Sequence, residues 1–273
     1  MAITHTCTDA FEKYEWEVSR NKRGARWEAF RLAAFCRMPL GAVKMSELDA
    51  THIAAWRDKR LLTVQGGTVT HELNLLSHVF SVARKEWKWL KASPTTDVAR
   101  PKAKPPRDRR TSADEIERIC FALGWDHWAV GLEPKTNQQR IAVAWLFAME
   151  TGMRAGEILA LEETDVSGRV AKIRMSKTEM PREVPLSPRA IERWAMVSKG
   201  FGVTSDLLDA MFRRARDNAG VKGLTFHDSR HEAITRLARK MGVLDLARMV
   251  GHKDIRQLQV YYNATADDIA SLL

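Results

Sequence analysis

Six polar side chains in the second half of the sequence have, together, the chemistry needed to break a phosphodiester without a metal ion. They are Arg154, Lys177, His227, Arg230, His252 and Tyr261. Guanidinium and ammonium groups can neutralise phosphate oxygens, imidazoles can hold or transfer protons, and a phenol can attack phosphorus. The set therefore predicts phosphoryl transfer through a covalent tyrosyl intermediate, with no catalytic metal and no other cofactor.

Arg154 lies at the start of a predicted helix. Residues 151–157 read T-G-M-R-A-G-E and follow the apolar run 141–149. Free N–H groups at a helix start attract anions, and the guanidinium fork can hold two phosphate oxygens. Glu157 could either orient that guanidinium or cap the helix. Most arginines at helix starts are ordinary surface residues, so the position gains weight only from the rest of the set.

Lys177 lies in the polar turn of a predicted β-hairpin. Apolar residues with strand-like spacing flank residues 176–182 on both sides. A lysine in a turn is commonly just solvated. A hairpin can also carry a flexible cation into a groove, where it can donate a proton to a leaving 5′ oxygen.

His227 and Arg230 open another predicted helix. They are three residues apart, so they share one face of its first turn, and Asp228 is the expected cap. A single histidine at a helix start is usually structural. Its pairing with an arginine beside a second arginine-bearing helix start favours a phosphate site. We assign no chemistry to His231.

His252 follows a glycine after an apolar helix, and Tyr261 comes nine residues later. Tyr262 is a competing candidate for the nucleophile. Adjacent residues of a helix point about 100° apart, so only one of the two tyrosines can face the site.

Charge and composition separate the chain into parts. The 273 residues carry a net charge of +10, and residues 1–110 hold 21 Lys/Arg against 12 Asp/Glu. Such an excess of positive charge suits binding to an anionic polymer, although a basic surface that is merely solvated would have the same composition. Residues 91–110 contain four prolines and seven Lys/Arg. We predict a helical domain at 1–92, a basic linker at 93–110 and a mostly helical domain with a small β-hairpin at 111–273, a mainly α fold.

Five cationic side chains of the linker are candidate DNA contacts. They are Lys102, Lys104, Arg107, Arg109 and Arg110. In this interpretation the linker lies along the phosphates and does more than join the two domains. The three cysteines have no metal-ligand or redox spacing, which indicates reduced thiols. The longest apolar run has nine residues, too few to cross a membrane. We expect a cytoplasmic protein without a signal peptide or membrane partner.

The order of these motifs resembles the tyrosine recombinase family, also called phage integrases. Arg154 in T-G-M-R-x-x-E resembles the first family arginine, and Lys177 precedes an R-x-V-P-L strand at 182–186. His227 and Arg230 resemble the H-x-x-R box, His252 the G-H box, and Tyr261 the nucleophile, which is why we choose it over Tyr262. Ser229 and Met249–Val250 depart from residues common in the family without affecting catalytic positions.

The resemblance implies a site-specific recombinase that cleaves and rejoins duplex DNA through a 3′-phosphotyrosyl intermediate, in integration, excision or inversion of the shufflon type. It implies a homotetramer on two DNA sites and a core-binding role for the first domain; accessory DNA-bending proteins are candidate partners. The alternatives are a type IB topoisomerase-like enzyme, which relaxes DNA without sequence demand, and a non-catalytic DNA-binding relative.

Overall fold

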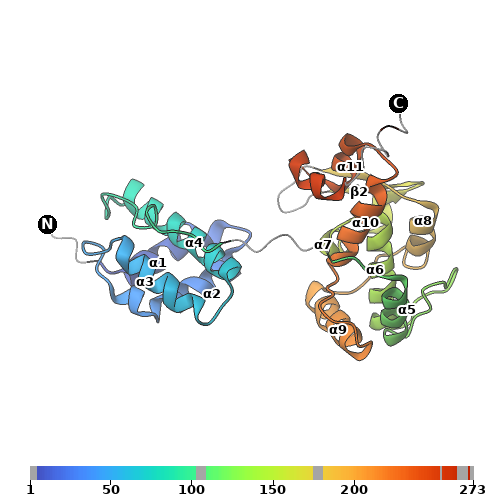
Figure 1. Cartoon of the computed structure of the whole chain (residues 1–273), viewed down its shortest axis with the longest axis horizontal. Helices are drawn as coiled ribbons and strands as arrows, with labels where there is room; N and C mark the ends of the chain where they lie inside the picture. Colours follow the sequence, from blue (N-terminus) through green and yellow to red (C-terminus); the bar gives the residue numbers. More distant parts are fainter. Residues whose placement is uncertain (1–4, 103–108, 175–180, 253, 263–269, 271–273) are drawn as a thin grey trace. The chain divides into compact units, whose positions relative to one another are not determined.

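The computed structural model describes residues 5–102, 109–174, 181–252, 254–262 and 270. The chain divides into two compact units, Met1–Pro106 and Arg107–Leu273 (Figure 1). Helices dominate both units, and the second also carries a small antiparallel sheet. The predicted mainly α fold is therefore confirmed.

The first unit is a helical bundle around one apolar core. Its helices are α1 (Cys7–Glu17), α2 (Ala25–Cys36), α3 (Ala50–Leu61) and α4 (Gly66–Lys85), with 3-10 turns η1 (Ser19–Asn21) and η2 (Pro39–Ala42). Phe11 packs against both Phe35 and Phe80 in the core. A pair of glycines such as 66–67 favours a break in a helical pattern, but here it forms the first turn of α4, where backbone N–H groups need no helical partner.

The segment predicted as linker, residues 93–110, contacts both units at its described ends. Val98 is buried in the core of the first unit, and Arg57 donates to the Ala99 carbonyl oxygen at 2.7 Å. At the other end Arg109 pairs with Glu115, and Arg110 pairs with Glu232 at 2.7 Å. Both of these carboxylates belong to the second unit, so the ends of the segment are held by tertiary contacts.

The second unit surrounds a central apolar helix with shorter elements. Its helices are α5 (Ala113–Ala122), α6 (Asn137–Thr151), α7 (Ala155–Leu159), α8 (Pro188–Ala195), α9 (Ser205–Asn218), α10 (Asp228–Ala238) and α11 (Val243–Val250), with 3-10 turns η3 (Glu163–Asp165) and η4 (Ile255–Tyr261). The sequence of residues 255–262 predicts an α-helix, whereas η4 has the tighter 3-10 geometry.

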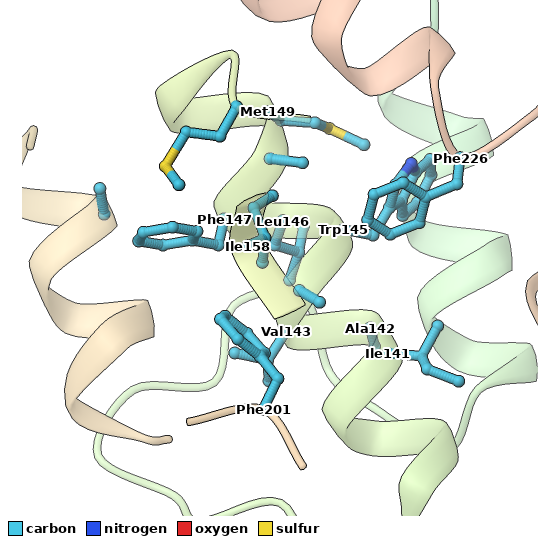
Figure 2. Packing of buried hydrophobic residues seen from close by; sticks show 14 of the residues in the cluster. Ile141, Ala142, Val143, Trp145, Leu146, Phe147, Met149, Ile158, Phe201 and Phe226 are labelled. Carbon is cyan, nitrogen blue, oxygen red and sulfur yellow. The ribbon is translucent and has the colours of Figure 1, made fainter. Parts of the chain in front are cut away.

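Helix α6 is the centre of this unit. Thr136 and Gln139 form a capping box at its start, and Gly152 ends it with a left-handed φ of 64°. Residues 141–149 are buried on every side of the helix, and Trp145 and Phe147 pack in opposite directions (Figure 2). A helix that is apolar all round must lie inside a domain. Because α6 is held on all sides, its C-terminal end positions the elements that pack around it.

The sheet has the order β1-β2-β3 and is antiparallel throughout. Its strands are β1 (Val166–Ser167), β2 (Val170–Ile173) and β3 (Arg182–Pro185). Ala171 pairs with Val184, and both side chains are buried. The hairpin predicted from strand periodicity is present, and β3 packs against α11. Within the described ranges no helix is long and apolar enough to span a membrane.

Candidate active site

The ends of α6 and α11 and the start of α10 meet around Gly152. A Cβ added to Gly152 would lie 3.4 Å from Val250 Cγ1 and 3.7 Å from Ala233 Cβ, so the three elements approach closely there. Its φ of 64° is also one that side chains with a Cβ rarely adopt. The glycine in the T-G-M-R motif thus allows the turn that brings Arg154 next to α10 and α11.

Among the predicted site residues that the structure describes, Arg230 is the most deeply buried, at 4% exposed. Its Nη1 donates to the Gly152 carbonyl oxygen at 2.6 Å and its Nη2 to the Val250 carbonyl oxygen at 2.7 Å. Both acceptors lie at helix C-termini, where carbonyl groups carry partial negative charge. These two bonds fix the plane of the guanidinium and explain how a cation is tolerated at this depth.

Arg154 is the N-cap residue of α7 and is held by Glu157. The Glu157 carboxylate accepts from the Arg154 backbone N at 2.9 Å and from Nη1 at 3.2 Å. Glu157 therefore does both things that the sequence left open: it caps the helix and it orients the guanidinium. The Arg154 side chain is one-third exposed, which leaves it in reach of solvent.

Arg182 completes this network from strand β3. Its Nη1 and Nη2 donate to the two carboxylate oxygens of Glu157 at 2.9 and 2.8 Å, and its Nε donates to the Met249 carbonyl oxygen at 3.0 Å. Burial raises the pKa of Glu157, but the bonds from Arg182 and Arg154 outweigh burial and hold the pKa below its usual value. Glu157 therefore stays ionised and ties the hairpin strand to α7.

His227 precedes α10 and remains exposed to solvent. Its pKa is nevertheless lowered, because neighbouring protein displaces some water from the ring and because the cations of Arg230 and Arg154 oppose protonation. Asp228 partly counters this effect and accepts from the Thr225 backbone N at 2.6 Å, which fixes the turn before the helix. A neutral imidazole at neutral pH can accept a proton.

His252 is placed by the turn that ends α11. Gly251 adopts a left-handed φ of 71°, and the backbone N–H groups of Gly251 and His252 both donate to the Ala247 carbonyl oxygen, at 2.9 and 3.0 Å. His252 is half-buried and lies two residues after Val250, whose carbonyl oxygen binds Arg230. The G-H motif thus places a histidine two residues beyond a backbone oxygen that binds Arg230.

The two tyrosines of η4 and its C-terminal cap have different surroundings. The Tyr262 hydroxyl donates to the Met241 carbonyl oxygen at 3.0 Å, and burial raises its pKa. The Tyr261 ring instead packs against the His231 ring, with centroids 4.9 Å apart and planes at 58°. His231 follows Arg230 directly on α10, so Tyr261 lies beside the helix turn that carries His227 and Arg230.

One protein-family model matches most of the second unit. The model of the phage integrase family matches residues 109–200 and 196–268, which is more than half of the chain. The chain belongs to the phage integrase family. The match covers the candidate active site and most of the second unit.

Curated relatives of this family member extend the similarity to the first unit. A putative integrase/recombinase of Haemophilus influenzae is 35% identical over 97% of the chain and 89% of its own length. The shufflon-specific DNA recombinase of Escherichia coli is 32% identical over 97% of the chain and 70% of its own length.

Solved structures show the same fold at low sequence identity. The Tn1549 transposon integrase in complex with a circular intermediate DNA matches with a TM-score of 0.75 and 17% identity over 98% of both chains. A lambda integrase tetramer bound to a Holliday junction matches with a TM-score of 0.76 and 17% identity, over 95% of this chain and 78% of that one.

Three predicted site residues of this family member, Lys177, Lys104 and Arg107, lie outside the described residues. Of the other linker cations, Lys102 is exposed, and Arg109 and Arg110 are paired with acidic side chains of the second unit. In the described part of the chain no three His, Cys, Asp or Glu side chains are grouped so that they could hold a metal ion.

Two residues at the site were given no role from the sequence. In the sequence Arg182 stands out only as part of the R-x-V-P-L strand, and no chemistry is assigned to His231. The spacing of His231 carried a signal: it lies four residues after His227, and residues at i and i+4 share a helix face. For Arg182 the partner Glu157 lies 25 residues away, a contact that only the tertiary fold reveals.

Proposed function

We propose that Tyr261 is the nucleophile with which this DNA-breaking and rejoining enzyme performs site-specific recombination. The observation that carries the choice is the contrast between the two tyrosines. The Tyr262 hydroxyl is bonded to the Met241 carbonyl oxygen, whereas the Tyr261 ring lies against the helix turn that bears His227 and Arg230. A nucleophile must lie beside the cations that bind its phosphate, and the contact of Tyr261 with His231, the residue after Arg230, supports the choice of Tyr261.

The reaction exchanges one phosphoester bond for another. The Tyr261 oxygen forms a bond to the DNA phosphorus, the bond from phosphorus to the 5′ oxygen breaks, and a 3′-phosphotyrosyl ester and a 5′ hydroxyl result. His227, whose pKa is lowered, accepts the phenol proton, and Lys177 supplies a proton to the leaving oxygen. Attack of a 5′ hydroxyl on the tyrosyl ester reverses these steps and rejoins the strand without ATP.

The arginines stabilise the charge that develops on phosphorus. Arg154 and Arg230 bind the non-bridging oxygens, and His252 donates a hydrogen bond to one of them. Each such donor is typically worth about 10²–10³ in rate. The bonds of Arg230 to Gly152 and Val250, and of Arg154 to Glu157, hold these donors in place before DNA binds.

The biological setting is proposed from the relatives. The chain is similar to a shufflon-specific recombinase, which favours strand exchange between specific sites over topoisomerase-like relaxation. A tetramer on DNA is proposed because a lambda integrase tetramer on a Holliday junction shares the fold. We further propose that residues 1–92 bind DNA and that the linker cations contact phosphates. We also propose that the enzyme acts in the cytoplasm and that DNA-bending proteins assist it.

A nicked suicide substrate tests the proposal, because loss of a short DNA fragment traps the covalent intermediate. The wild-type protein should form an adduct with DNA that survives denaturant, Tyr262→Phe should form it too, and Tyr261→Phe should not. An adduct in Tyr261→Phe that disappears in Tyr262→Phe would assign the nucleophile to the other tyrosine. Relaxation of supercoiled plasmids that lack any recombination site would instead favour the topoisomerase-like alternative.

A further inference from the structure

The His231 side chain lies against the ring of the proposed nucleophile. The imidazole and phenol centroids are 4.9 Å apart with planes tilted by 58°, a geometry that aromatic pairs favour over a face-to-face stack. The two rings come from different elements, α10 and η4, which pack against each other. The contact therefore fixes the nucleophile's segment to the phosphate-binding helix.

His231 lies on the same part of α10 as two of the proposed site residues. His227, Arg230 and His231 are spaced i, i+3 and i+4 and so share one face of the helix. His231 is also close enough to His227 to influence its charge state. One helix turn therefore carries the proposed proton acceptor, a phosphate ligand and the ring that touches Tyr261.

The His231 ring itself is enclosed. Both of its nitrogens are shielded from solvent, although the residue as a whole is half-buried. Arg230, its neighbour in sequence, is fixed by two carbonyl oxygens, and this anchors the helix turn from which His231 projects. An enclosed ring on an anchored turn is a rigid surface, whereas η4 contributes only a short 3-10 segment.

We infer that His231 is a positioning residue, whose ring packs on the Tyr261 ring and holds the phenol oxygen in line with the scissile phosphate. This inference rests on the proposed function of Tyr261. The role depends on the shape of the ring and does not require transfer of a proton by His231. Reactions of this kind are sensitive to placement, since a displacement of about 1 Å can cost about 10²-fold in rate.

Single-turnover cleavage of a suicide substrate at saturating protein tests the inference, with DNA affinity measured separately. His231→Ala should slow adduct formation by about tenfold or more while the dissociation constant for DNA changes by less than about twofold. His231→Phe, which keeps a planar ring, should restore the rate to within about threefold of wild type. His231→Asn, which keeps polarity without an aromatic ring, should not restore it.

The chain offers a matched control at a second histidine–aromatic pair. The rings of His127 and Trp128 lie 4.7 Å apart on the loop between α5 and α6. His127→Ala removes a similar contact and should leave cleavage unchanged. A wild-type rate in His231→Ala would overturn the inference, and so would equal slowing by His127→Ala.

The paired substitutions decide the question even if His231→Ala does not fold. If His231→Phe cleaves about tenfold faster than His231→Asn, ring packing is supported. Equal rates, or a faster His231→Asn, overturn it. The result with the wild-type protein separates failure of this inference from failure of the proposed function. If wild type forms no adduct, the assignment of covalent cleavage fails; if it does and the variants do not follow the stated order, only the role of His231 fails.

Discussion

Replacement of Glu157 by glutamine should destabilise the second unit far more than loss of an ordinary surface ion pair. The Glu157 and Arg182 side chains are 5% and 8% exposed and share two hydrogen bonds of 2.9 and 2.8 Å. Removal of one partner of such a buried pair costs about 3–5 kcal/mol, because a buried charge is left uncompensated. The ion pair with the one-third-exposed Arg154 side chain adds less than about 1 kcal/mol.

Glutamine keeps one oxygen as an acceptor, so we expect the lower end of that range, about 3 kcal/mol. For a unit of this size that corresponds to a fall in melting temperature of roughly 6–12 °C. Calorimetry and urea unfolding of the full chain should show the change in the transition of the second unit. Asp209→Asn is the control, since Asp209 and its partner Arg213 are 71% and 57% exposed. It should cost less than about 1 kcal/mol.

The dependence on pH follows from the lowered pKa of Glu157. The folded state holds the ionised form more strongly than the unfolded chain does. The stabilisation is therefore present above the unfolded pKa, about 4.3, and is lost as pH falls through the folded pKa. The gap in stability between wild type and Glu157→Gln should shrink in acid. A Glu157→Gln variant as stable at neutral pH as Asp209→Asn would refute the role of this buried pair.

Three further predictions concern the reaction and the DNA. Arg230→Lys keeps the positive charge but loses the guanidinium fork that is bonded to two carbonyl oxygens. Cleavage of the suicide substrate should fall by at least about 10²-fold while DNA binding is retained. A near wild-type rate would contradict the role of Arg230 in binding phosphate. The lowered pKa of His227 predicts that the cleavage rate declines only below about pH 6.5. His227→Gln should abolish this acidic limb of the pH–rate profile. An unchanged profile would exclude His227 as the proton acceptor. Replacing Lys102, Lys104 and Arg107 by glutamine should reduce the slope of log K against log salt by about 0.9 for each phosphate that the protein no longer neutralises, and an unchanged slope would make this segment a plain tether.

The sequence predicted the elements that depend on local signals. The apolar run at 141–149 and the glycine after it define α6 closely, and strand periodicity locates the hairpin. Local signals failed where tertiary packing decides. Helical spacing of apolar residues predicts a helix over 69–90, whereas α4 ends at Lys85, and Val98 of the predicted linker is buried. Both outcomes depend on packing within the first unit, which periodicity does not encode.

The candidate site shows the same division. The order of the six polar residues was enough to predict the chemistry and the family. It did not reveal that Arg230 is bonded to the ends of two helices or that Arg182 shares Glu157 with Arg154, because those contacts join residues 20 to 78 positions apart. The i+4 spacing places His231 on the same helix face as His227, but its contact with Tyr261 joins residues 30 positions apart and depends on the tertiary fold.

Mass spectrometry of the trapped protein–DNA adduct tests the central claim most directly. Trypsin should release the peptide that follows Arg256, which contains both Tyr261 and Tyr262. After nuclease digestion, fragmentation of that peptide locates the remaining nucleotide. The account predicts a 3′-linked nucleotide on Tyr261 alone. A nucleotide on Tyr262, on another side chain, or linked through a 5′ phosphate would contradict it.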